Sequence, residues 1–257
     1  MLRGTARGKS QIMLHSFARP RLRSLQRWLE AGVDLVFPPL CAGCGTPGVE
    51  WCAECDGRLA RILAPVCTRC GRPVGRGPVC PDCRRKALPL EARAYAEYSG
   101  PLVPALLQMK YRPNRRLGGV MSGWLMELVS REAWSVDLVT AVPLSSRRQA
   151  VRGYNQSDLI AHKLSDRLGI QFSSEALSRI RDTRSQVGLD PLARAINVRG
   201  AFSANKNLVE GRRILIVDDL FTTGATLAAC HAALSSAGAQ RAYGISVGRA
   251  RANRPTK

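Results

Sequence analysis

Histidine, aromatic residues and long apolar runs are scarce in this sequence. The three histidines, His15, His162 and His231, lie far apart and beside no nucleophile or carboxylate motif, which excludes a histidine-based triad or acid/base pair. No apolar run approaches the roughly 18 residues of a membrane span, which excludes a spanning protein. No secretory signal pattern appears at the start, so we predict a cytoplasmic location.

Acidic residues are also few: 19 Asp and Glu stand against 39 Lys and Arg, a net charge of +20. Such a field attracts polyanions, whether nucleic acid, pyrophosphate-bearing small molecules or anionic lipid, and charge alone does not choose among them. Residues 1–21 contain no acid at all and are predicted to be a basic tail, although a transit peptide has the same composition. Residues 251–257 form a second tail.

Residues 22–40 have apolar side chains at helical spacing up to the Pro38-Pro39 pair, which predicts an amphipathic helix. Such a helix would pack against the rest of the protein or lie on a membrane surface.

Cysteine is abundant, and eight of the nine cysteines form four CxxC pairs within residues 41–83. Four thiolates complete a closed tetrahedral zinc site, whereas a redox or disulfide role is the alternative. Cys230 lies apart, in an alanine-rich stretch that favours a packed helix and an inert buried thiol. The predicted metal ligands are Cys41, Cys44, Cys52, Cys55, Cys67, Cys70, Cys80 and Cys83.

The cysteine-rich segment repeats itself, because the pattern CxxCGxP at Cys41 returns at Cys67 and each copy is followed by its own second CxxC pair. Four ligands per copy predict one structural zinc ion per unit, hence two successive ribbons over residues 41–86 rather than an interleaved arrangement. Each ribbon is too small to bury a core, so the metal would supply its folding free energy.

Beyond the ribbons, short apolar strands alternate with helices. The pattern predicts strands over residues 94–98, 138–142, 214–217 and 242–247, and helices over 102–110, 117–129, 155–168 and 226–237. This alternation is typical of an α/β fold, a parallel sheet covered by helices on both faces, here spanning residues 87–250.

The stretch from Ile214 to Thr226 carries the clearest chemistry. An apolar strand leads to Asp218 and Asp219, and a turn of hydroxyl residues and glycine then opens a helix. The backbone N–H groups of such a turn bind phosphate, while the acids suit ribose hydroxyls or Mg²⁺. No Gly-Lys-Ser/Thr follows this glycine, which excludes a Walker loop. The stretch therefore predicts a site for a sugar phosphate with a metal.

This stretch resembles the signature of the type I phosphoribosyltransferases. The resemblance implies that the acids contact the ribose hydroxyls of phosphoribosyl pyrophosphate (PRPP), bound with Mg²⁺. It assigns the 5′-phosphate to the loop residues Thr222, Thr223, Gly224, Ala225 and Thr226.

Further motifs, VP…R…RGYNQ and T..Q..L….R..N…AF, together with the cysteine-rich front, are similar to the ComF family, which combines a double zinc ribbon with a type I phosphoribosyltransferase fold. The resemblance implies a pyrophosphate loop at Pro143, Leu144 and Ser145. The arginines Arg147, Arg148 and Arg152 would be its charge partners, or else part of a solvated basic face.

The segment from Arg181 to Asn197 would be either a mobile lid or a stapled hairpin, contributing Thr183 and Gln186 to PRPP binding. Catalytic roles would fall to Asp218, Asp219, Arg152 and Arg194.

Two classes of function follow. The first is displacement of pyrophosphate from Mg-PRPP by a nitrogen nucleophile, in the service of DNA uptake. The second is binding without turnover, either of single-stranded DNA alongside other competence proteins or of PRPP as a regulatory signal.

Overall fold

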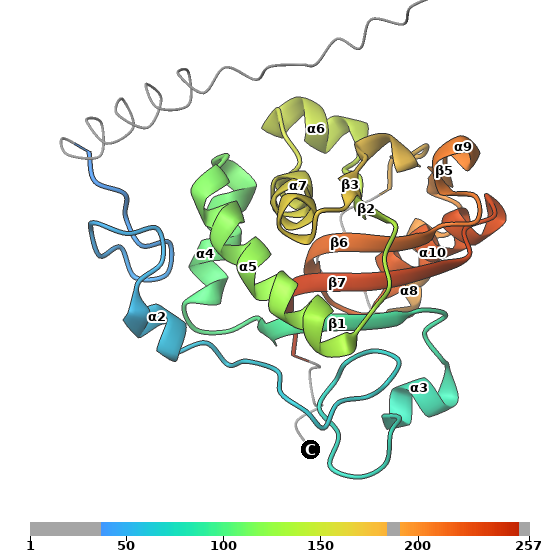
Figure 1. The fold of residues 1–257 in the computed structure, drawn as a ribbon, viewed down its shortest axis with the longest axis horizontal. Coiled ribbons are helices and arrows are strands. Elements are labelled where there is room, and N and C mark those ends of the chain that lie inside the picture. Colours follow the sequence, from blue (N-terminus) through green and yellow to red (C-terminus); the bar gives the residue numbers. More distant parts are fainter. Residues whose placement is uncertain (1–36, 184–190, 252–257) are drawn as a thin grey trace, which may run out of the picture. The chain divides into compact units, whose positions relative to one another are not determined.

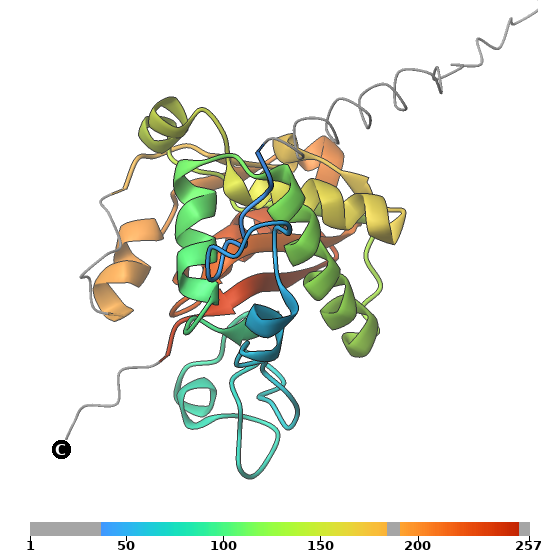
Figure 2. The same cartoon turned by 90° about the vertical axis from the view of Figure 1, so that its left-hand side faces the viewer.

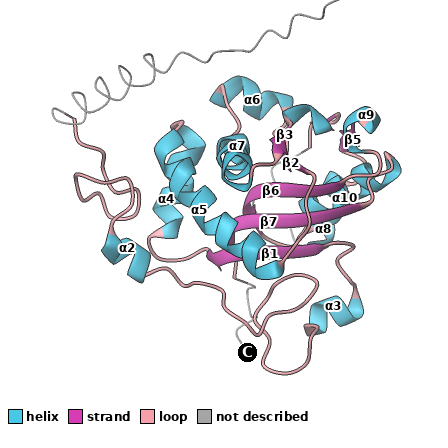
Figure 3. Ribbon diagram, viewed as in Figure 1, coloured by secondary structure: helices cyan, strands magenta, loops and turns pink. Residues whose placement is uncertain are grey.

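The computed structural model describes residues 37–183 and 191–251. Gln186 therefore lies outside the described residues, as does the helix predicted over 22–40 except for its last four residues. From Leu40 onward these residues form one compact unit. Its centre is a five-stranded sheet in the order β1-β7-β6-β2-β3, in which every pair of neighbours is parallel. The predicted α/β class with a parallel sheet is confirmed (Figure 3).

The strands of this sheet are β1 (Glu91–Glu97), β2 (Leu138–Ala141), β3 (Gln171–Phe172), β6 (Arg213–Phe221) and β7 (Arg241–Arg249). The helices are α2 (Ala53–Gly57), α3 (Pro81–Arg85), α4 (Leu102–Tyr111), α5 (Arg115–Glu132), α6 (Ser146–Arg152), α7 (Gln156–Leu168), α8 (Pro191–Val198), α9 (Lys206–Val209) and α10 (Ala225–Ser236).

Alternate side chains of the central strand point to two separate cores. Leu215 and Val217 of β6 join the core beneath α4, α5 and α7, whereas Ile214 and Ile216 join the core shared with α10. A strand buried on both faces reads as a continuous apolar run, which is why the period of two is hidden in this segment. Figure 1 shows the two groups of helices on opposite faces of the sheet.

The strands and helices predicted from residue 94 onward are confirmed, with bounds displaced by up to four residues. The two-stranded antiparallel sheet of β4 (Leu177–Arg179) and β5 (Phe202–Ala204) was not predicted, because three-residue strands carry too little alternation to be recognised. The short elements β3, α6, α8, α9 and the 3-10 turn Ser174–Ala176 were not predicted either.

The ribbon segment covers the outer edge of β1. The backbone N–H of Ala92 donates to the carbonyl of Arg69 (2.7 Å). The N–H of Ile62 donates to the carbonyl of Tyr95 (2.8 Å), and the N–H of Glu97 donates to the carbonyl of Ala60 (2.8 Å). These bonds satisfy a strand edge that would otherwise remain open to association. In Figure 2 the ribbons, blue and cyan, lie beside α4 and along this edge of the sheet.

No helix within residues 37–183 and 191–251 is long and apolar enough to cross a membrane.

Candidate functional site

Two clusters of four cysteines lie in the ribbon segment. In each cluster the sulfur atoms lie within 4.8 Å of one another, the first formed by Cys41, Cys44, Cys52 and Cys55 and the second by Cys67, Cys70, Cys80 and Cys83. Four convergent thiols are the donor set that tetrahedral Zn²⁺ prefers, and a closed four-thiolate site suits a structural ion. The predicted arrangement of one metal site per repeat is confirmed.

The repeat in sequence is also a repeat in backbone structure. An isolated antiparallel bridge joins Leu40 to Pro47 in the first ribbon, and the equivalent bridge joins Val66 to Pro73 in the second. Cys52 and Cys80 then occupy the N-cap positions of α2 and α3. Because each bridge, CxxC pair and short helix of the first ribbon has a counterpart in the second, a ligand variant in one ribbon can be controlled by the equivalent variant in the other.

The acids at the end of β6 lie next to each other, partly or fully buried. The Asp219 side chain is 10% exposed, and its Oδ2 lies 3.4 Å from Lys110 Nζ and 3.3 Å from Gln156 Nε2. The Asp218 Oδ1 accepts the backbone N–H of Asp219 (2.9 Å). Burial and the charge of Asp219 raise the pKa of Asp218 well above its usual range. Such a pair is suited to binding a cation or hydroxyl groups.

The RGYNQ motif reaches these acids through Gln156. Arg152 Nη1 donates to Gln156 Oε1 (2.9 Å), which orients the amide so that its nitrogen faces Asp219. Asn155 caps α7 and donates to the carbonyl of Val142 (3.1 Å), tying the motif to the end of β2. Arg152 is therefore linked to Asp219 only through the side chain of Gln156, whereas Lys110 contacts Asp219 directly.

The phosphate loop predicted at Thr222–Thr226 begins α10. Gly224 holds the N-cap position with a φ of +81°, a conformation that favours glycine, and no side chain caps the helix there. The Thr223 hydroxyl accepts the N–H of Ala225 (3.4 Å). A helix start without a side-chain cap, next to two hydroxyl residues, can bind an anion through backbone N–H groups.

The predicted pyrophosphate loop follows β2. Ser145 is buried and caps α6, accepting the N–H of Arg148 (3.4 Å), while Pro143 and Leu144 are partly exposed. Arg147 and Arg148 are exposed on α6. Burial of Arg179 in β4, together with the charge of Arg148, lowers the pKa of Arg179. Two neighbouring guanidinium groups favour an anion between them.

At its described ends, the segment between β4 and β5 is held by hydrogen bonds, and whether it acts as a lid or as a stapled hairpin stays a prediction. Arg181 Nη2 donates to the carbonyls of Asn197 (3.2 Å) and Arg199 (2.8 Å), and the Thr183 hydroxyl contacts the Arg179 guanidinium. Thr183 is thus held by Arg179. Neither Lys110 nor Arg179 was predicted for this site, because each reaches it from a separate segment with no motif of its own.

A cavity of about 1560 Å³ runs from the loop along α10, between the second ribbon and the α8–β5 segment. Arg194 lines this cavity, as do Thr222, Thr223, Gly224 and Ala225, whereas Asp218 and Asp219 do not. The structure therefore groups Arg194 with the loop rather than with the acids. Asp82 is the single acid among the lining residues, and the cations are Arg72, Lys86, Arg194, Arg199, Lys206, Arg249 and Arg251.

Asp158, in the first turn of α7, is a partly buried carboxyl group whose ionisation should affect the stability of the protein. Burial raises its pKa to about 6, while a hydrogen bond from Asn155 Nδ2 (3.1 Å) opposes the shift. A raised carboxyl pKa means that ionisation destabilises the fold as pH rises from about 4 to above 6. We expect Asp158→Asn to stabilise the protein by about 1–2 kcal/mol at pH 7, and by much less at pH 5. Urea unfolding at both pH values measures this, and an equal gain at both would contradict it.

The arrangement described above defines a class of protein: a parallel α/β sheet with paired acids and a glycine-containing helix start at one strand end, joined to a double zinc ribbon. A double zinc ribbon domain family matches residues 32–84. DNA utilization protein YhgH of Escherichia coli K12 is 35% identical over 205 residues, covering 76% of this chain and 89% of its own. Competence protein ComFC of Bacillus subtilis is 29% identical over 193 residues, covering 70% of this chain and 76% of its own.

The chain belongs to the ComF family, in which these relatives fall. Among solved structures it is similar to glutamine PRPP amidotransferase from B. subtilis, at 23% identity and a TM-score of 0.38, covering 55% of this chain and 30% of that one. It is also similar to adenine phosphoribosyltransferase from Thermoanaerobacter pseudethanolicus, at 20% identity and a TM-score of 0.31, covering 49% and 79%. These likenesses are too distant to transfer an activity.

Proposed function

We propose that this chain is a cytoplasmic protein that binds Mg-PRPP where β6 meets α10 and that it serves the use of DNA taken up by the cell. The observation that carries the proposal is the pair Asp218 and Asp219 near the end of β6, followed within a few residues by the start of α10, which lacks a side-chain cap hydrogen bond at Gly224. Carboxylates suit ribose hydroxyls and Mg²⁺, and a helix start suits phosphate, so one ligand with both groups fits the two halves.

The described charges support this ligand. Lys110 Nζ and Gln156 Nε2 both contact the same oxygen of Asp219, Oδ2, and the charge of Lys110 also acts on Asp218. Ser145 caps the basic helix that carries Arg147 and Arg148, and the charge of Arg148 acts on Arg179. The diphosphate of PRPP would relieve the repulsion between these last two cations.

Transfer would proceed by attack of a nitrogen nucleophile at C1 of the ribose, as the bond from C1 to the diphosphate oxygen breaks and its electron pair leaves with the diphosphate. Magnesium supplies charge neutralisation for the departing group when it is bound. The acids would hold the ribose hydroxyls, and the loop at Thr222–Thr226 would hold the 5′-phosphate, so that C1 is presented to the nucleophile.

Calorimetric titration of the metal-loaded protein with PRPP, with and without Mg²⁺, tests the proposal. We expect saturable binding that requires Mg²⁺ because two neighbouring carboxylates repel an anionic ligand unless a cation lies between them. A titration without heat in either condition would contradict the proposal.

That negative result would favour the second function, binding of single-stranded DNA. The observation behind it is the cavity along α10, whose lining carries seven cations and one acid. Binding of this kind would weaken steeply with salt, because each neutralised phosphate releases counterions.

A further inference from the structure

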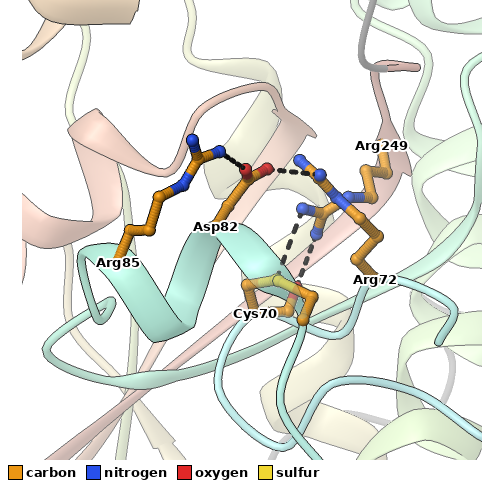
Figure 4. A network of polar contacts seen from close by, with 6 residues as sticks. Cys70, Arg72, Asp82, Arg85 and Arg249 are labelled. Atoms are coloured by element: carbon orange, nitrogen blue, oxygen red, sulfur yellow. Dashed lines mark hydrogen bonds and ion pairs between the residues drawn. The ribbon is translucent and has the colours of Figure 1, made fainter. Parts of the chain in front are cut away.

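Arg249, the last residue of β7, links the second ribbon to Phe221, the residue before the loop Thr222–Thr226. Arg249 is 6% exposed, and its guanidinium donates to the Cys70 carbonyl (Nη1, 2.5 Å) and lies 3.7 Å from the Cys70 sulfur through Nη2. Figure 4 shows both contacts, with Arg72 and Arg85 held by Asp82 beside them. A buried cation is therefore satisfied by the backbone and sulfur of a predicted metal ligand.

The same guanidinium covers the residue that precedes the loop. Its central carbon lies 4.3 Å from the centroid of the Phe221 ring, within the range of a cation–π contact. The next residue, Ala250, donates its N–H to the Phe221 carbonyl (2.8 Å). The ends of β6 and β7 are thereby fixed to each other at the point where the loop begins.

The turn at Gly224 is enclosed from both sides. A Cβ at Gly224 would lie 2.8 Å from Leu88 Cδ1 and 3.1 Å from Phe221 Cζ. Leu88 lies five residues after Cys83, the last ligand of the second cluster. The side chains of Leu88 and Phe221 both belong to the core shared with α10. The loop conformation therefore depends on Phe221 from the strand and on Leu88, which lies just after the second ribbon.

The first ribbon has no such contact among the described residues. Trp51 packs edge-on against Trp124 of α5 (5.1 Å between centroids), and Glu50 accepts a hydrogen bond from Asn114 (2.7 Å). Its cysteines do not line the cavity beside the loop, whereas Cys70 and Cys83 of the second ribbon do. The two ribbons thus have different neighbours despite their matching sequences.

We propose that metal binding at the second ribbon, acting through Arg249 and Leu88, holds the loop Thr222–Thr226 in its ligand-binding conformation. Arg249 is a positioning residue in this scheme. Loss of the metal releases the backbone at Cys70, which removes the partner of a buried cation and loosens the packing of Phe221 and Leu88 around Gly224. The identity of the ligand rests on the proposed function, but the order of the loop does not.

The experiment compares the matched ligand variants Cys80→Ser and Cys52→Ser, together with Arg249→Lys, in the full chain. Hydrogen exchange of the loop amides reports loop order without any ligand, and calorimetry with Mg-PRPP reports affinity. We expect Cys80→Ser to speed exchange at the loop and to raise the Kd for Mg-PRPP by about tenfold or more, the effect of one lost charge-assisted hydrogen bond. Cys52→Ser should leave both values near those of the wild type.

Arg249→Lys retains the charge but loses the two-pronged contact, so it should raise loop exchange while leaving both metal ions bound. This variant decides the question if Cys80→Ser fails to fold, and the urea midpoint separates a local effect from a global one. Equal loop exchange in Cys80→Ser, Cys52→Ser and the wild type would overturn the inference. Absence of PRPP binding by the wild type would instead overturn the proposed function, and the exchange comparison would still stand.

Discussion

Replacing both acids at the end of β6, Asp218→Asn with Asp219→Asn, is expected to weaken magnesium-dependent PRPP binding by at least about a hundredfold, or roughly 3 kcal/mol. Asparagine retains the size of aspartate but carries no charge, so it cannot neutralise a cation bound with the diphosphate. Calorimetric titration of the double variant measures the loss. Binding equal to that of the wild type would mean that these acids do not form the site.

The same double variant should be more stable than the wild type. Burial and the neighbouring charge of Asp219 raise the pKa of Asp218, so the folded state disfavours ionisation of this carboxyl. That cost is absent below the ordinary carboxyl pKa and grows as pH rises towards and through the raised value. Removing both charges at pH 7 should therefore raise the free energy of unfolding by about 1–3 kcal/mol. Loss of binding with gain of stability distinguishes a functional pair from a structural one.

Asp166→Asn is the control for this experiment. Asp166 lies on the exposed face of α7, 55% exposed, beside His162 and Lys163. A solvated carboxylate of this kind contributes little to stability. The control should leave both PRPP affinity and the unfolding midpoint close to those of the wild type.

The wild-type pH profile follows from the same carboxyl group. Because its pKa is raised, protonation begins at a higher pH than for an ordinary aspartate, so magnesium-dependent binding should weaken earlier on acidification. The measurement is the PRPP affinity across mildly acidic pH.

The candidate site could be predicted from sequence wherever its groups are contiguous. Asp218, Asp219 and the loop at Thr222–Thr226 lie on one short stretch, and local chemistry alone identifies them as a sugar-phosphate motif. Lys110 and Arg179 carry no such signal, because Lys110 meets Asp219, and the charge of Arg148 acts on Arg179, only once the chain is folded. A single lysine or arginine in a chain with 39 of them cannot be distinguished by composition.

For the metal sites, too, the sequence predicts the local ligands but not the parts of the fold that the ribbons contact. The CxxC spacing and the repeat predict two successive sites, because ligand type and spacing fix what a metal requires. The partner of each ribbon could not be predicted, since Cys70 meets Arg249 only after β7 is placed beside β6. The sequence around Arg249 contains several other basic residues and does not predict that this arginine is buried against Phe221.

Removal of the metal ions is the second large effect. We expect two Zn²⁺ ions per chain to be released on modification of the thiols, with a large fall in the thermal unfolding midpoint. The ribbon helices α2 and α3 are five residues each, and zinc binding in small metal domains supplies about 10–16 kcal/mol of apparent free energy at pH 7. Cys52→Ser and Cys80→Ser should each retain one ion, whereas Cys230→Ser should retain both.

Cys230 is a suitable control because burial raises the pKa of its thiol well above the usual range and it lies in α10, outside both clusters. Release of two ions from Cys52→Ser or Cys80→Ser, or of none from the wild type, would contradict two independent four-cysteine sites.

Metal loss should also change how the chain associates. Backbone groups at Ala60, Ile62 and Arg69 bond to the outer edge of β1, so a ribbon segment that unfolds exposes the edge of a five-stranded sheet. An open edge pairs readily with a second chain. We therefore expect the metal-free protein to aggregate while the parallel sheet keeps its amide protection, as measured by light scattering and hydrogen exchange. Uniform loss of protection across β6 and β7 would mean that the ribbons stabilise the whole fold rather than one edge.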